Sequence, residues 1–288
     1  MKSTGLHILT ILVFAISAYR CGENLSGPST GDLFGPPQNL QAQSLDQSSV
    51  KLKWLPPQAD SLVKAYIVQW GVKVDSVSRT TLSFTVGSLS VGPTTFVVRS
   101  QNSTGTQSIP VSITWAPAAR FDSAYVVNEY DLQNPTSLQG LDVGTQTKNP
   151  STLLIDANAV LTIDLLCYGG GNKQIALPLA LWSAGLYQIN FNQTKFSTVT
   201  NPSASLDFYQ SSFPDGSTFS SDSVTVVDNT IYYVRVIGEN QTFLYARLHV
   251  HVVPGLAFPN RRIEVRISLQ RVTNLLFAEN TTHHNHGG

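Results

Sequence analysis

The sequence predicts an all-β protein built from two domains. Charged residues make up only 12% of the chain and the formal net charge is +0, so the polar surface must come largely from Ser, Thr, Asn and Gln. Short segments such as Val50-Lys51-Leu52-Lys53-Trp54 alternate apolar and polar side chains, and Pro, Gly, Asn or Ser end each of them. Two packed antiparallel sheets require such two-faced strands. We therefore expect an N-terminal β-sandwich followed by a second β-rich sandwich or barrel-like domain.

The start of the chain is typical of an export signal. Lys2 and His7 give a weakly basic beginning, and the run from Ile8 to Tyr19 is apolar apart from Thr10 and Ser17. A helix of this length spans roughly 18 Å, which falls short of the roughly 30 Å hydrocarbon core of a membrane. We therefore expect residues 1–20 to be a cleaved signal peptide and the protein to be exported.

Two ways of processing this leader stay open. The small residues of Ile16-Ser17-Ala18 suit an ordinary signal peptidase. Alternatively, Cys21 resembles the acylated cysteine that begins a bacterial lipoprotein, although Arg20 stands where such proteins usually carry a small residue. Residues 21–35 are rich in Gly, Ser, Pro and Thr and are predicted to be a flexible tether. The protein is then expected either in the cell envelope, held by this lipid alone, or in the extracellular space.

The first domain contains further segments in which apolar residues recur at every second position. Each such set shares one face of an extended segment, while polar side chains take the other face. The sets are Tyr66, Val68 and Trp70; Leu82, Phe84 and Val86; Phe96 and Val98; and Ile109, Val111 and Ile113.

This succession of strands resembles a fibronectin type III domain over about residues 36–116. The resemblance rests on a core tryptophan, a strand tyrosine and the pattern around the later corner of the family: Trp54, Tyr66, Leu89, Gly92, Phe96, Asn102 and Gly105. Phe96 stands where the family has Tyr, so the hydroxyl hydrogen bond of the tyrosine corner is absent. The resemblance implies an immunoglobulin-like sandwich, with Trp54, Tyr66, Leu89 and Phe96 in its core, that spaces or binds and rarely catalyses.

A second β-rich domain is predicted for residues 118–278, after a junction at Trp115-Ala116-Pro117-Ala118. Residues 279–288 are expected to be a disordered tail. Gly169-Gly170-Gly171 is interpreted as a turn between strands, because no Lys-Ser/Thr or helix start follows it. The expected strands are Ser123 to Tyr130, Ser151 to Ile155, Ala159 to Tyr168, Ala184 to Asn190, Ser205 to Tyr209, Ser223 to Val227, Thr230 to Ile237, Leu244 to Val253 and Arg262 to Val272.

Part of this second domain resembles HmuY-type exported lipoproteins. The residues that carry the resemblance are the runs Gly140-Leu141-Asp142-Val143, Thr162-Ile163-Asp164-Leu165, Tyr232-Tyr233-Val234-Arg235 and Tyr245-Ala246-Arg247-Leu248-His249-Val250. The resemblance implies an all-β exported protein, and some members of that family capture haem. No haem ligand is carried over, because no stretch matches a ligand-bearing motif.

His249 and His251 are the candidate metal ligands. Two positions apart on a strand, they point to the same face, and such imidazole pairs can share a zinc or copper ion. Arg247 lies on that face too, and its charge opposes a cation. A third ligand is not placed by the sequence, and an ordinary strand with a polar outer face is the alternative interpretation.

Other chemistry finds less support. The chain has 2 Cys, and Cys167 lies in an apolar segment typical of a small buried thiol. Carboxylates are scattered without a catalytic spacing, and no basic patch with interleaved aromatic residues favours nucleic acid. Trp182, Tyr187, Tyr209 and Phe213 are candidates for a sugar-stacking platform or for core residues.

We therefore predict a non-catalytic, exported binding, adhesion or scaffold protein without a cofactor, whose partner is an unknown protein or carbohydrate. The alternative hypothesis is a lipoprotein that captures haem, metal or carbohydrate.

Overall fold

The computed structural model describes residues 34–130, 139–154, 163–170, 172–176, 194–201, 213–221, 223–256 and 261–277. The predicted signal peptide, Cys21, nearly all of the tether and the tail from 279 lie outside these residues, so these assignments stay predictions. The described part is made of strands joined by turns and short 3-10 segments, which confirms the all-β fold class. Within it, no helix is long and apolar enough to cross a membrane.

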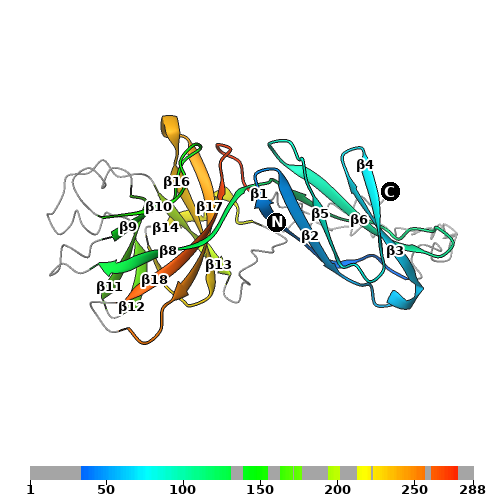
Figure 1. Cartoon of the computed structure of the whole chain (residues 1–288), viewed down its shortest axis with the longest axis horizontal. Coiled ribbons are helices and arrows are strands. Elements are labelled where there is room, and N and C mark those ends of the chain that lie inside the picture. Colours follow the sequence, from blue (N-terminus) through cyan, green and yellow to red (C-terminus); the bar gives the residue numbers. More distant parts are fainter. Residues whose placement is uncertain are drawn as a thin grey trace, which may run out of the picture.

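Two sheets face each other in the first lobe, which comprises residues 34–115 (Figure 1). All pairings within these sheets are antiparallel. The three-stranded sheet has the order β1-β2-β5, and the four-stranded sheet has the order β4-β3-β6-β7. The strands are β1 (Gln38–Asp46), β2 (Ser49–Leu55), β3 (Val63–Trp70), β4 (Lys73–Ser78), β5 (Ser83–Val86), β6 (Thr94–Asn102) and β7 (Val111–Trp115).

The core of this lobe lies between the two sheets. Trp54 and Tyr66 are buried there and meet edge to face, with ring centroids 5.4 Å apart. Phe96 is also fully buried, and Leu89 packs against the cluster from the loop before β6. The expected strand containing Ile109 begins later, at Val111, because the intervening Pro110 has no backbone N–H to donate to the sheet.

One large sheet forms the second lobe, which comprises residues 119–277 (Figure 1). Its main path runs β10-β9-β11-β8-β18-β17-β16-β13-β14, and β12 joins β11 to β15. The strands are β8 (Ala119–Tyr130), β9 (Gln139–Asp142), β10 (Ser151–Leu154), β11 (Leu165–Gly170), β12 (Asn172–Ala176), β13 (Lys195–Asn201), β14 (Phe219–Ser221), β15 (Ser223–Thr225), β16 (Thr230–Ile237), β17 (Phe243–Val252) and β18 (Arg262–Gln270). Gly169 and Gly170 end β11, and Gly170 pairs with Asn172 at the start of β12, as a turn between two strands requires.

The three central strands β16, β17 and β18 have two different faces. Residues such as Val234, Leu248 and Val265 belong to a buried core with β9 and β11. Alternate residues face the other way. This second face carries Tyr233 and Tyr245 near the first lobe, and it becomes polar farther along β17, at His249 and His251.

Both lobes share one hydrophobic cluster at their junction. Trp115, the last residue of β7, is fully buried against Phe277, with ring centroids 6.2 Å apart. The guanidinium of Arg247 from β17 lies 5.1 Å from the Trp115 ring centroid and 4.5 Å from that of Phe277. The backbone N–H of Ala116 donates to the carbonyl of Phe277 at 2.8 Å. We call Trp115, Arg247 and Phe277 the junction clamp.

Hydrogen bonds surround the junction clamp. The Trp115 indole N–H donates to the Ser44 hydroxyl at 3.0 Å, which ties β7 to β1. The Gln270 side-chain amide donates to the Pro117 carbonyl at 3.1 Å, and Arg120 donates to Gln43 at 3.2 Å across the junction. Apolar packing and polar contacts therefore both join the lobes.

Candidate functional site

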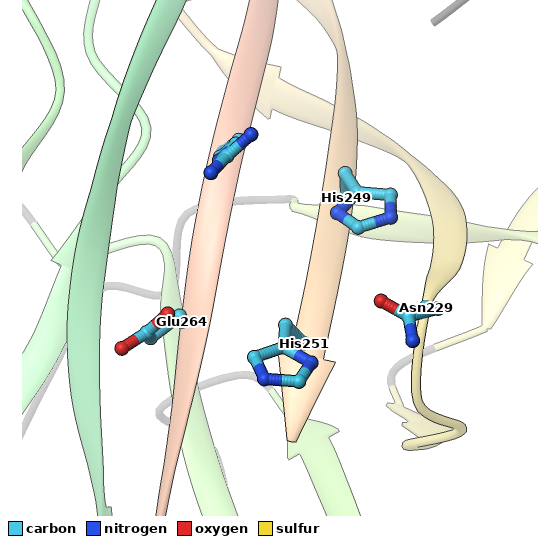
Figure 2. A pocket seen from close by; sticks show the side chains of 5 residues that line it. Asn229, His249, His251 and Glu264 are labelled. Atoms are coloured by element: carbon cyan, nitrogen blue, oxygen red, sulfur yellow. The ribbon is translucent and has the colours of Figure 1, made fainter. Parts of the chain in front are cut away.

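A cleft lined by polar residues lies on the second face of strands β17 and β18, beside the turn that precedes β16. Its volume is about 190 Å³, and it is lined by Asn229, His249, His251, Glu264 and Arg266. Figure 2 shows the two imidazole rings along β17, with Asn229 on one side and Glu264 on the other. Imidazole, amide, carboxylate and guanidinium groups therefore converge on one small space.

Strand register brings these residues together. His249 and His251 alternate with the core residues Leu248 and Val250, so both project from the same face of β17. Arg266 is the cross-strand partner of His249 on β18, and Glu264 is the partner of His251. Directly opposed side chains in antiparallel strands lie about 4.5–5.5 Å apart at their Cβ atoms. The cleft is thus a direct product of the β17–β18 pairing.

The turn before β16 forms another wall. Asn229 has a φ of 51°, a left-handed conformation that Asn tolerates better than most residues. Asp228 accepts hydrogen bonds from the Nδ1 atom of His251 and from the backbone N–H of Val252, each at 2.8 Å. This carboxylate therefore orients one cleft imidazole and holds the end of β17.

Burial, hydrogen bonds and neighbouring charges shift the pKa values of Asp228 and His249. Burial raises the pKa of Asp228, but the Val252 N–H, the hydrogen bond from His251 and the charge of His251 outweigh it and hold that pKa below its usual range. Burial lowers the pKa of His249, and the positive charges of Arg266 and His251 add to the effect. At neutral pH His249 is therefore uncharged, and it can both donate and accept a hydrogen bond.

A metal site at His249 and His251 stays a prediction. The two side chains share one cleft, and Glu264 lines it as well. However, no group of three or more His, Cys, Asp or Glu side chains in the described ranges is placed to hold a metal ion. Arg266 places a positive charge in the same cleft, and this charge opposes cation binding.

The carboxylates of Asp142 and Asp164, which are far apart in the sequence, both bind the loop that follows β9. The Asp142 side chain accepts from the Gly144 N–H at 2.7 Å, and the Asp164 side chain accepts from the Val143 N–H at 2.9 Å. Both residues are buried. Each carboxylate is thus engaged by the backbone of one tight loop, which is a structural role.

The remaining candidates of the sequence lie apart from the cleft. Cys167 is buried in the core of the second lobe, as its apolar neighbours indicate. Phe213 is buried in the junction cluster, where it stacks on Phe277 at 5.0 Å. Trp182, Tyr187 and Tyr209 lie outside the described residues. The cleft partners Asn229, Glu264 and Arg266 were not predicted, because strand register brings Glu264 and Arg266 to the histidines and Asn229 reaches the cleft from a separate turn.

Fold and site together define an all-β protein with two lobes and a polar surface cleft. No family model and no curated protein matches the chain. Among solved structures, it is similar to a fibronectin type III domain of the human collagen alpha-1(XX) chain, with 25% identity and a TM-score of 0.29, over 33% of this chain and 92% of that one. It is similar to the FN5 domain of Drosophila Lar, with 23% identity and a TM-score of 0.23, over 29% of this chain and 96% of that one.

A two-domain fibronectin type III segment of chicken tenascin is also similar, with 12% identity and a TM-score of 0.26, over 74% of this chain and 99% of that one. All three TM-scores are low. The assignment of the fold class therefore rests on the sheets themselves.

Proposed function

We propose that this chain is an exported, non-catalytic binding protein whose second lobe holds a small uncharged, hydroxylated ligand such as a sugar unit. The observation that carries the proposal is the convergence of Asn229, His249, His251, Glu264 and Arg266 on one cleft of about 190 Å³. Binding sites commonly combine a concave surface with a few convergent polar groups. All of these side chains end in planar groups that donate or accept hydrogen bonds, as sugar hydroxyls require.

The charge balance of the cleft favours a neutral ligand. Glu264 is acidic, Arg266 is basic, and the lowered pKa of His249 leaves its imidazole uncharged at neutral pH. His251 is engaged by Asp228 at 2.8 Å. An anion would meet Glu264 and a metal cation would meet Arg266, so either would bring an unbalanced charge into the site.

The volume and lining disfavour haem at this cleft. Drug-sized ligands usually occupy pockets of about 300–1,000 Å³ with mainly apolar and aromatic walls. The cleft is smaller than that range, and the residues that line it are polar. A single sugar ring or a chain end fits this scale better.

A titration with neutral monosaccharides, read out by calorimetry on the full chain, tests this function. We expect glucose, galactose, mannose or N-acetylglucosamine to bind with a dissociation constant of about 1 mM or tighter. Arg266→Gln should weaken binding at least tenfold. Arg262→Gln removes the same charge from an exposed position on the same strand and should leave binding unchanged. Sodium acetate, zinc chloride and haemin are the comparison ligands; binding of any of these, with no sugar response, would overturn the assignment.

The location outside the cytoplasm is a second part of the proposal. It is supported by the apolar run from Ile8 to Tyr19 and by Cys21 directly behind it. Acylation of Cys21 would hold the two lobes at a membrane surface through the tether, where they act as an adhesion or scaffold unit. The intact mass of the mature chain tests this: lipid addition that disappears in Cys21→Ser indicates a lipoprotein. A mature chain without lipid that begins directly after Ala18 indicates ordinary secretion.

A further inference from the structure

Within the part of the chain that the structure describes, strand β4 forms the outer edge of the first lobe and is paired on one side only, with β3. β4 is the terminal strand of the order β4-β3-β6-β7. Almost all of its residues are exposed, including Val74 at 61%, and Val72 in the preceding turn is 99% exposed. Such an edge presents unpaired backbone N–H and C=O groups to another strand.

The geometry of the β3–β4 hairpin decides which backbone groups point outward. Trp70 pairs with Lys73 across the two-residue turn of Gly71 and Val72, and Gly71 has a φ of 54°. The residues that close such a turn exchange hydrogen bonds, and hydrogen-bonded pairs then alternate along the ladder. Lys73 and Asp75 therefore bond to β3, whereas Val74 directs its N–H and C=O outward.

A side-chain contact supports this alternation. The backbone N–H of Ser76 donates to the Asp75 carboxylate at 2.7 Å, so it is not directed at β3. Ser76 lies two positions after Val74, so its backbone N–H and C=O point to the same side of β4 as those of Val74. The outward row of β4 thus contains a donor and an acceptor at Val74, at the middle of the exposed stretch.

The sequence of this edge is complementary to itself in the antiparallel direction. When two copies are placed with Val74 opposite Val74 of the second copy, Lys73 faces Asp75 on both sides of the two-fold axis. On the other face, the exposed Val74 lies opposite Val74 of the second copy, so the two valines form an apolar pair across the axis. Val74 is also a residue whose outward N–H and C=O can form the reciprocal pair that this register needs. Opposite charges and apolar pairs placed across strands are each favourable.

We propose that β4 is a self-association edge, through which two copies of this chain join their four-stranded sheets into one continuous sheet. A two-fold interface uses the same patch on both subunits, and this register satisfies that condition. Because a single strand buries little surface, we expect reversible, concentration-dependent dimers rather than a permanent complex.

Sedimentation of the full chain over a range of concentrations tests the proposal. Lys73→Glu alone and Asp75→Lys alone each place like charges opposite one another, and each should weaken self-association about tenfold or more. A mixture of the two variants restores both opposite-charge pairs and should form mixed dimers. Lys64→Glu is the control for net charge, since Lys64 is exposed and lies off this edge, and it should associate as the parent does.

Val74→Pro provides a second, independent test. Proline is tolerated where a strand N–H faces solvent, so the lobe should still fold, as circular dichroism would verify, while the dimer should be lost. Association that persists in Val74→Pro, or variants whose mixture shows no rescue, would assign the contact to another surface and overturn the proposal. A parent chain that stays monomeric at all concentrations would instead mean that Lys73 and Asp75 protect the edge from pairing.

Discussion

Truncation of Trp115 to Ala is the most informative perturbation of this fold, because this side chain belongs to the core that both lobes share. The indole is fully buried, donates to Ser44 at 3.0 Å, and contacts both the Phe277 ring and the guanidinium of Arg247. Burial lowers the pKa of Arg247 to about 9, so the guanidinium is still charged at neutral pH and can bind the ring faces.

The magnitude follows from these contacts. Removing a buried Trp costs about 3–5 kcal/mol through lost transfer free energy and the cavity left behind. The aromatic pair adds about 0.5–1.5 kcal/mol, and leaving the Ser44 hydroxyl without its donor adds about 1 kcal/mol or more. Because such contributions are not additive, we expect a loss of about 5 kcal/mol in the free energy of unfolding. Typical total stabilities are about 5–15 kcal/mol.

Urea unfolding followed by circular dichroism measures this loss. The parent chain should unfold in one cooperative transition, whereas Trp115→Ala should separate the lobes into two transitions or leave one lobe unfolded. Trp115→Phe is the matched control, since it keeps an aromatic ring, loses the indole hydrogen bond and part of the ring volume, and should cost clearly less than Trp115→Ala. A Trp115→Ala chain that loses less than about 1 kcal/mol and keeps a single transition would refute the importance of the junction clamp.

Four further outcomes are expected. Trp54→Ala should leave the first lobe largely unfolded, because a loss of about 3–5 kcal/mol removes much of its stability; a normal melting transition near that of the parent would contradict this. Among the described residues the buried Tyr66 hydroxyl has no hydrogen-bond partner, so Tyr66→Phe should be neutral or stabilise by up to about 1 kcal/mol in urea unfolding. Burial raises the pKa of Asp142, although the Gly144 N–H and a nearby lysine oppose this. Ionisation of this carboxyl therefore costs stability as the pH rises through the folded pKa. Asp142→Asn keeps the acceptor for Gly144, so it should raise the urea midpoint at pH 7 and have less effect near pH 4. The pKa of the His249 imidazole is lowered on folding, so the unfolded chain binds the proton first and stability should fall as the pH drops below about 6.5. His249→Gln should reduce this dependence of stability on pH in a series of melting curves. An unchanged dependence on pH in the variant would argue against this role of His249.

Regular alternation of side chains made part of the fold predictable. The strand expected at Thr230 to Ile237 is β16 with the same bounds, and β17 and β18 differ from expectation only at their ends. Successive side chains of these strands lie in two different environments, so the two-residue period of a β-strand is visible in their sequence. By contrast, β4 was not predicted, because it is exposed on both faces and its sequence has no apolar side to recognise.

The candidate site was predictable only along a single strand. His249 and His251 were placed on one face by their spacing, whereas Arg266 and Glu264 meet them through the register of β17 with β18. Nothing within either strand specifies that register. Arg247 was interpreted as a charge beside the histidines, but it is buried between two rings supplied by distant parts of the chain. Such long-range contacts leave no local signal.

The junction clamp also has a consequence for biosynthesis. Synthesis proceeds from the N-terminus, and domains generally fold as they emerge. The first lobe is synthesised early. Gln270, whose side chain donates a hydrogen bond to the Pro117 carbonyl, follows Pro117 by 153 residues, and Phe277 is synthesised later still. Until then, the side of the Trp115 indole that contacts Phe277 and Arg247 is exposed on the nascent chain. We therefore expect chaperones to bind ribosome-bound or prematurely ended chains. They should dissociate once the segment that contains Gln270 and Phe277 covers Trp115.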